Sequence, residues 1–175
     1  DAEVVLSKLN QILLDAQKQL QQATHIIITY GTSWVYRHIE TNAIVANCHK
    51  VPQKQFTKEL LSIDSIQKAI QNTVSLIATL NPKCNFIFTV SPVRHLKDGF
   101  VENQVSKAHL IAAIYATTNT KQQTLNYFPS YEIMMDELRD YRFYAEDMIH
   151  PSQVAIDYIW EQFKESSIPE TAYVT

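Results

Sequence analysis

Three short apolar runs, separated by segments with helical spacing, constrain the fold of this chain more than any other feature of its sequence. The runs span 24–30, 85–90 and 125–128, and they are enriched in β-branched and aromatic residues. Short continuous runs of this kind are typical of strands buried on both faces of a parallel sheet. Because helices and strands alternate, right-handed crossovers should join the strands. The sequence therefore predicts an α/β fold in three layers, with helices covering a parallel sheet.

Periodic apolar residues predict the helices that accompany these strands. The predicted helices span 4–22, 64–80, 103–117, 131–138 and 152–163. Asp64 is the predicted N-cap of the second helix, and Pro82 ends it. Pro151 lies near the first turn of the last helix. Residues 35–39 and 43–46 flank a short polar turn and carry a weak hairpin signal.

The order of these elements also bears on how much of the fold is present. Three strands make a small sheet for 175 residues, and the first predicted element is a helix rather than a strand. We therefore expect that at least one leading strand-and-helix unit is absent. No internal repeat, linker or low-complexity segment divides the chain, so we expect residues 1–175 to form a single domain, truncated at its N-terminus.

Composition excludes several classes of partner. The formal net charge of −3 provides no basic field for nucleic acid or anionic lipid. No apolar run approaches the roughly 20 residues that span a bilayer, and Asp1–Glu3 lacks the basic region of a signal peptide. Cys48 and Cys84 both have apolar neighbours, which favours a reducing compartment over a disulfide scaffold. We expect a cytoplasmic protein without nucleic-acid or membrane partners, and the oligomeric state stays open.

Three polar loops are predicted to meet at one edge of the sheet. In open parallel sheets, ligands bind beyond the carboxyl ends of the strands. The loops that fall there are Gly31–Trp34, Ser91–His95 and the long stretch from Ser130 to His150. Most of the unusual polar residues of the chain lie in these loops, so the candidate site is expected where they converge.

Asp147 and His150 form the candidate acid–base pair. They lie three residues apart in a loop before the last helix. A carboxylate can hold the Nδ1–H of an imidazole and leave Nε2 as a general base. The alternative is that Asp147 is a surface acid and His150 simply a residue near a helix start.

The other two loops offer groups for an oxyanion or a substrate. Gly31 can turn sharply after its strand, and Thr32 and Ser33 can add hydroxyl donors. The alternative is a tight turn in which Trp34 packs in the core. Arg94 and His95, together with Asp98, could bind an anionic or hydroxyl-rich substrate, or could form a solvated loop with a local ion pair.

The remaining reactive residues give weaker signals. Cys48 and His49 are adjacent, but the chain has no Cys-x-x-Cys or His-x-x-x-His spacing, so we expect neither a metal site nor a cofactor. Cys48 is less favoured as a nucleophile than as a packed side chain. The aromatic and charged stretch 131–144 is either a wall of the substrate cleft or a packed loop in which Arg139 and Arg142 pair with acids.

Taken together, these segments resemble the GSCFA family, predicted esterase relatives within the SGNH-hydrolase group. The similar stretches are Gly31–Arg37, Ala46–Lys50, Ser91–Gly99, Tyr127–Glu132, Asp136–Tyr144 and Asp147–Ser152. The resemblance implies a flavodoxin-like three-layer fold and hydrolysis of an acyl or acetyl ester, with a small molecule or a glycan ester as substrate.

The resemblance assigns roles residue by residue. Asp147 and His150 match the Asp-x-x-His block, which supplies the triad acid and base. Gly31–Trp34 lies where a Gly-x-Asn-Asp block follows its strand. There Ser33 replaces the oxyanion-hole Asn, and Trp34 replaces the acidic residue.

The Gly-Ser-Cys-Phe-Ala motif that names the family, and that would carry the nucleophilic serine, is not in the sequence. This agrees with the leading unit that element order predicts to be absent. Either the chain starts downstream of that block, so that the nucleophile lies upstream of it, or the protein has lost the block. Ser33 and Ser91 are the nearest substitutes by their position in the loops. The alternative function is a non-catalytic binding domain, with a glycan as a candidate ligand.

Overall fold

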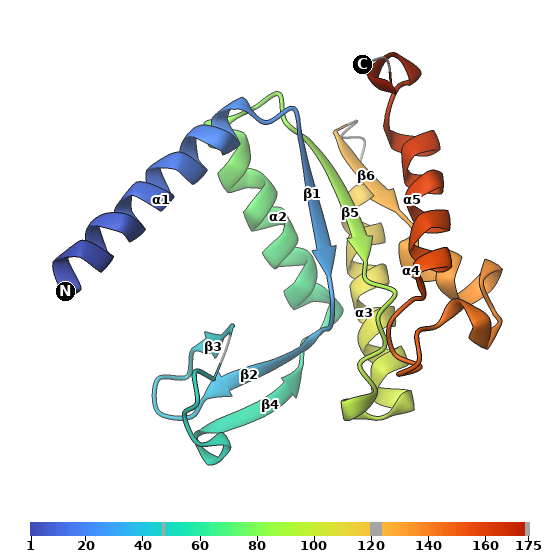
Figure 1. The fold of residues 1–175 in the computed structure, drawn as a ribbon. Helices are drawn as coiled ribbons and strands as arrows, with labels where there is room; N and C mark the ends of the chain where they lie inside the picture. Colours follow the sequence, from blue (N-terminus) through green and yellow to red (C-terminus); the bar gives the residue numbers. More distant parts are fainter. Residues whose placement is uncertain (47, 120–123, 174–175) are drawn as a thin grey trace.

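A parallel sheet of three strands lies at the centre of the molecule (Figure 1). The computed structural model describes residues 1–46, 48–119 and 124–173. The strands are β1 (His25–Tyr30), β5 (Asn85–Val90) and β6 (Leu125–Phe128), in the order β1-β5-β6. All three predicted strands and their parallel pairing are therefore confirmed. Within the described residues β1 pairs with β5 alone, so it forms an edge of this sheet.

Alternate residues of β5 point into two different layers. Phe86, Phe88 and Val90 pack against α2 (Ile63–Leu80) and α3 (Phe100–Thr118) on one face. On the other face, Ile87 packs with residues of α5 (Gln153–Ser167). Helices thus flank the sheet on both faces, and the predicted three-layer α/β/α architecture is confirmed (Figure 1).

Two helix predictions are wrong in detail. The N-cap of α2 is Ser62, whose hydroxyl accepts the N–H of Ser65 at 3.2 Å, whereas Asp64 lies in the first turn, where a carboxylate favours the positive helix end. The segment predicted as one helix over 131–138 divides into α4 (Ser130–Glu132) and a π-helix (Ile133–Glu137). The wider helix follows from the Leu138 N–H, which donates to the carbonyl of Ile133, five residues earlier.

A small antiparallel sheet lies to one side of the central sheet (Figure 1). It consists of β2 (Trp34–His38), β3 (Ile44–Val45) and β4 (Phe56–Leu60), in the order β3-β2-β4. The β2–β3 pairing confirms the hairpin, but β4 was not predicted. Short 3₁₀ turns complete the chain; they span Gln53–Gln55, Leu96–Asp98, Tyr141–Phe143 and Glu170–Tyr173.

The first helix, α1 (Ala2–Gln22), stands away from the rest of the molecule (Figure 1). It is amphipathic, as predicted, but none of its residues is buried. Only its end is fixed, because the side-chain amide of Asn81 donates to the carbonyls of Leu20 and Ala23 at 2.9 and 2.8 Å.

The face of the sheet beside α5 is incompletely covered at β1. Ile27 is 53% exposed there, and an apolar hollow of about 360 Å³ extends from Ile27 to Trp160 of α5. A further helix of a three-layer fold would cover such a face. The leading strand-and-helix unit stays a prediction. No helix in the described ranges has the length and apolar character needed to cross a bilayer.

Phe88 should be among the most important side chains for stability, because it is fully buried between β5 and the helices. Phe88→Ala should lower the free energy of unfolding by about 3–5 kcal/mol, measured by urea denaturation. Phe100→Ala is the matched control: Phe100 is 75% exposed, and its removal should change stability by less than about 0.5 kcal/mol. Equal effects of the two substitutions would contradict this account of the core.

Candidate functional site

The three predicted loops meet at the carboxyl edge of the parallel sheet. Gly31 follows β1 directly, and the Ser91 N–H donates to the carbonyl of Tyr30 at 2.9 Å. From the same loop as Ser91, the Arg94 N–H donates to the carbonyl of Ile149 at 3.2 Å. The candidate residues of all three loops therefore gather at one place, as the parallel order of the strands requires.

A tight turn brings Asp147 and His150 into contact. The Asp147 Oδ2 lies 2.6 Å from the His150 Nδ1, while Oδ1 accepts the N–H groups of Ile149 and His150 at 2.9 and 3.0 Å. Met148 has a φ of 57°, in the left-handed region, and its N–H donates to the carbonyl of Ala145. The turn therefore fixes both side chains through local hydrogen bonds.

This contact determines which imidazole nitrogen is available. An ionised carboxylate can only accept, so Nδ1 must carry the proton in the contact with Asp147. In the neutral ring the lone pair then lies on Nε2, the atom that a general base uses. Nε2 has no hydrogen-bonding partner in the part of the chain that the structure describes, and the His150 side chain is 60% exposed.

Arg94 braces the turn from the neighbouring loop. Its guanidinium carbon lies 3.8 Å from the ring centroid of Tyr144, and its Nη1 donates to the carbonyl of Met148 at 3.3 Å. The guanidinium is thus engaged in holding the loop that carries His150. Its predicted contact with substrate stays a prediction.

The backbone at Gly31 does not form the sharp left-handed turn that glycine permits. Its φ is not in the left-handed region, which among the glycines is adopted by Gly99 alone. A Cβ at Gly31 would lie 3.4 Å from the Nε2 of His95, in ordinary van der Waals contact with that ring. The His95 backbone is itself held, because its N–H donates to the Asn103 Oδ1 at 2.8 Å. Burial, with a further contribution from the positive charge of Lys107, lowers the pKa of His95.

The hydroxyl groups after Gly31 are directed at α3. The Ser33 N–H donates to the Ser106 Oγ at 2.8 Å, and the Ser33 hydroxyl donates to the Ser106 carbonyl at 3.0 Å. Thr32 contacts the same Ser106 hydroxyl at 2.9 Å. Ser33 is 1% exposed, so its predicted role as an oxyanion donor has no support in this geometry.

Trp34 begins β2 and is half-buried. Its indole N–H donates to the carbonyl of Glu102 at 3.3 Å, and the ammonium of Lys58 lies 4.9 Å from its ring centroid. The contact with Glu102 joins the small sheet to α3. Trp34 is not among the buried core residues, so it does not pack in the core as the alternative expected.

Lys107 also lies at this edge, and it was not predicted from the sequence. It is 1% exposed, and its Nζ donates to the carbonyls of Gly31 and Ser91 at 2.7 and 2.6 Å. Desolvation lowers its pKa to about 8. One signal was available, since Lys107 lies on the same helical stripe as Asn103 and Leu110, which are also buried.

Neither serine proposed as a substitute nucleophile is bonded to His150. Ser33 is committed to Ser106, and the Ser91 hydroxyl accepts the N–H of Val93 at 3.3 Å. Of the residues in the family-like stretch 46–50, Asn47 lies outside the described residues. In the described ranges, no three His, Cys, Asp or Glu side chains come together as metal ligands would.

The charged stretch before the turn forms local ion pairs. Arg139 pairs with Asp136 at 3.4 Å and Arg142 with Asp140 at 3.2 Å, all four side chains being largely exposed. The pairing of both arginines with nearby acids agrees with one element of the alternative interpretation of residues 131–144, in which Arg139 and Arg142 pair with acids.

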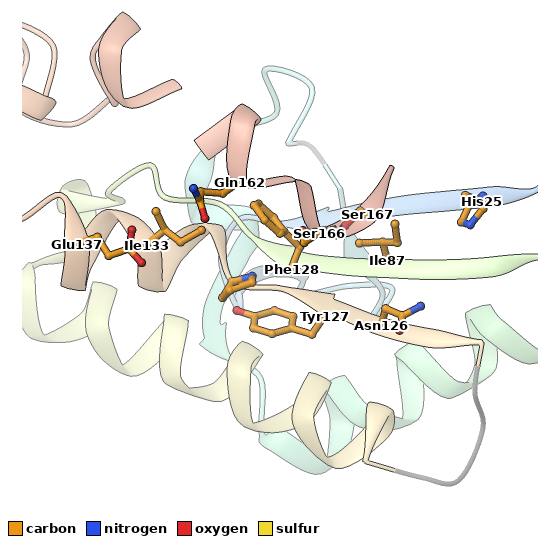
Figure 2. A pocket seen from close by; sticks show the side chains of 11 residues that line it. His25, Ile87, Asn126, Tyr127, Phe128, Ile133, Glu137, Gln162, Ser166 and Ser167 are labelled. Carbon is orange, nitrogen blue, oxygen red and sulfur yellow. Dashed lines mark hydrogen bonds between the residues drawn. The ribbon is translucent and has the colours of Figure 1, made fainter. Parts of the chain in front are cut away.

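A separate cavity of about 450 Å³ lies between β6 and the end of α5 (Figure 2). Figure 2 shows His25 at one end of it and Glu137 at the other. Glu137 already accepts the Tyr158 hydroxyl at 2.6 Å, and Tyr127 donates to Glu132 at 2.8 Å. None of the predicted site residues lines this cavity, so it is distinct from the edge that carries His150.

Fold and site together define a three-layer α/β protein with a carboxylate-held imidazole at the carboxyl edge of its parallel sheet. The model of the GSCFA family matches residues 1–163, so the chain belongs to the GSCFA family. A search of curated proteins gives no significant match.

The Asp147 carboxylate should titrate at unusually low pH. Hydrogen bonds from the backbone and ring of His150 and from the Ile149 N–H lower its pKa from 3.8 to about 2. Since this native value is below the unfolded one, the stabilisation is complete above pH 3.8 and is lost as the pH falls through about 2. NMR of the Asp147 carboxyl carbon should show that midpoint. His150→Ala, which keeps the backbone donors, should raise it part of the way. An Asp147 midpoint at the ordinary value would contradict the described turn.

Proposed function

We propose that this chain carries the general base and the orienting acid of an SGNH-type serine ester hydrolase. The observation that carries the proposal is the 2.6 Å contact between Asp147 and the His150 Nδ1, at the carboxyl edge of the sheet. The chain belongs to the GSCFA family, whose model matches residues 1–163, and this membership supports the same assignment. The substrate class is an acyl or acetyl ester of a small molecule or a glycan.

The chemistry assigned to His150 is proton transfer through Nε2. A serine hydroxyl attacks the ester carbonyl and forms a C–O bond while Nε2 takes its proton. The tetrahedral intermediate expels the alcohol, which takes that proton from the imidazolium, and leaves an acyl-serine. Water then attacks the acyl carbon while Nε2 takes its proton. The bond to the serine oxygen breaks, that oxygen regains the proton from the imidazolium, and the carboxylic acid is released. The attacking serine is not assigned to a residue of this chain, in line with the direction of Ser33 toward Ser106.

Asp147 acts through the imidazole. With a pKa of about 2, its carboxylate stays ionised across the pH range in which an imidazole changes charge. It therefore holds the ring in the tautomer that exposes Nε2 and stabilises the imidazolium formed during attack. Arg94 keeps the turn against the sheet edge through Met148 and Tyr144.

The alternative is binding without hydrolysis, with a glycan as the ligand. In its favour, no serine among the described residues is bonded to His150, and Tyr141 presents a 68% exposed ring whose centroid lies 6.3 Å from that of Tyr144. Exposed aromatic rings provide flat apolar surface for a sugar. A pure binder, however, has no use for an imidazole whose tautomer is fixed by a carboxylate.

His150→Ala in the full-length gene product should lower kcat/KM for p-nitrophenyl acetate by about 10²–10⁴-fold or more, because general-base assistance is lost. His25→Ala is the matched control: His25 is an exposed histidine at the amino end of β1, and its removal should leave hydrolysis unchanged.

Two outcomes would decide against the proposal. Equal activity of the wild type and His150→Ala would exclude His150 as the base. Binding of an acetylated oligosaccharide without turnover by the wild type would favour the alternative function.

A further inference from the structure

Lys107 is a buried cation without a carboxylate partner in the described part of the chain. Lys107 is 1% exposed, and none of the described ion pairs includes it. Moving an ammonium out of water costs several kcal/mol unless other groups replace its solvation. An apolar side chain such as Met would fill the space on α3 without that cost, so packing alone does not account for a lysine here.

The groups that replace its solvation belong to the candidate site. Nζ donates to the carbonyl of Gly31 at 2.7 Å and to the carbonyl of Ser91 at 2.6 Å. These residues directly follow β1 and β5. The ring of Tyr131 lies beneath the ammonium, 5.4 Å from centroid to Nζ. One side chain from α3 therefore joins the carboxyl ends of two neighbouring strands.

We propose that Lys107 is a positioning residue: its buried ammonium holds the carbonyl oxygens of Gly31 and Ser91 and thereby fixes Gly31 and the Ser91–His95 loop relative to each other. The same charge acts on His95, whose ring lies against Gly31 and whose pKa is lowered by burial and, to a smaller extent, by Lys107. Arg94, next to His95, carries the effect to the turn that holds His150. The consequence for catalysis rests on the proposed function, whereas the geometry does not.

Lys107→Met tests the proposal, with Lys68→Met, an exposed lysine on α2, as the matched control. In Lys107→Met the carbonyl ¹³C signals of Gly31 and Ser91 should shift and the pKa of His95 should rise. In Lys68→Met both should stay at their wild-type values. Unchanged signals and an unchanged pKa of His95 in Lys107→Met would overturn the proposal.

A titration of the wild type keeps the proposal testable if Lys107→Met does not fold. The titratable groups that the structure places near Lys107 are His95, from the loop after β5, and Tyr131 from α4. The pKa of His95 is lowered and that of Tyr131 is raised, so both move away from the range in which Lys107 loses its proton. The carbonyl signals of Gly31 and Ser91 should shift together with a midpoint of about 8. Carbonyl signals of Gly31 and Ser91 that do not respond while the Lys107 ammonium, followed by its own Nζ signal, loses its proton would overturn the proposal.

Hydrolysis by the full-length gene product separates this proposal from the function. Lys107→Met should lower kcat by up to about 10²-fold with little change in KM, since misplacement of the site affects the reaction more than binding. A wild type without esterase activity would reject the proposed function, while the carbonyl signals would still decide the role of Lys107. An unchanged kcat in an active enzyme would overturn the positioning role.

Discussion

The burial of β5 on both faces is the constraint on which the rest of the structure depends. Phe88 and Val90 are fully buried against α2 and α3, and Ile87 is buried on the side of α5. A shift of the strand by one residue would move the side chains of each face to the opposite face, where the packing does not fit them. Burial on both faces therefore fixes where β5 ends, and with it the position of the loop that carries Arg94 and His95.

The site at this edge is held in two physically different ways. The Asp147–His150 pair is local: the backbone N–H groups of Ile149 and His150 and the ring of His150 satisfy the carboxylate, and the exposed ring needs no burial to keep its orientation. Gly31 and Ser91 are instead held from a distance by a lysine of α3. The two supports are connected through Arg94, which contacts the carbonyls of Met148 and Ile149 in the turn that carries His150.

Local sequence was sufficient for much of this arrangement. Continuous apolar runs predicted all three parallel strands, and their order placed the three loops at one edge. The spacing of Asp147 and His150 predicted their contact, because a carboxylate three residues before an imidazole can reach it within a single turn.

Features that depend on distant partners could not be predicted. The strand β4 has no clear alternation of apolar and polar residues, and it forms because it pairs with β2. Ser33 looked like a free hydroxyl until α3 placed Ser106 beside it. The role of Lys107 was not predicted, since nothing local shows that two strand ends will surround it. Ser62 and Asp64 are both good caps, and only the observed helix start distinguishes them.

The tautomer of His150 decides whether this imidazole can serve as a general base. Nitrogen NMR of the ¹⁵N-labelled protein, at a pH where the ring is neutral, distinguishes a protonated nitrogen from one that carries a lone pair. We expect the proton of His150 on Nδ1, bound to Asp147, and an unprotonated Nε2 that can accept a proton. A proton on Nε2, or rapid exchange between the two tautomers, would show that Asp147 does not hold the ring and would contradict the assignment of His150 as the base.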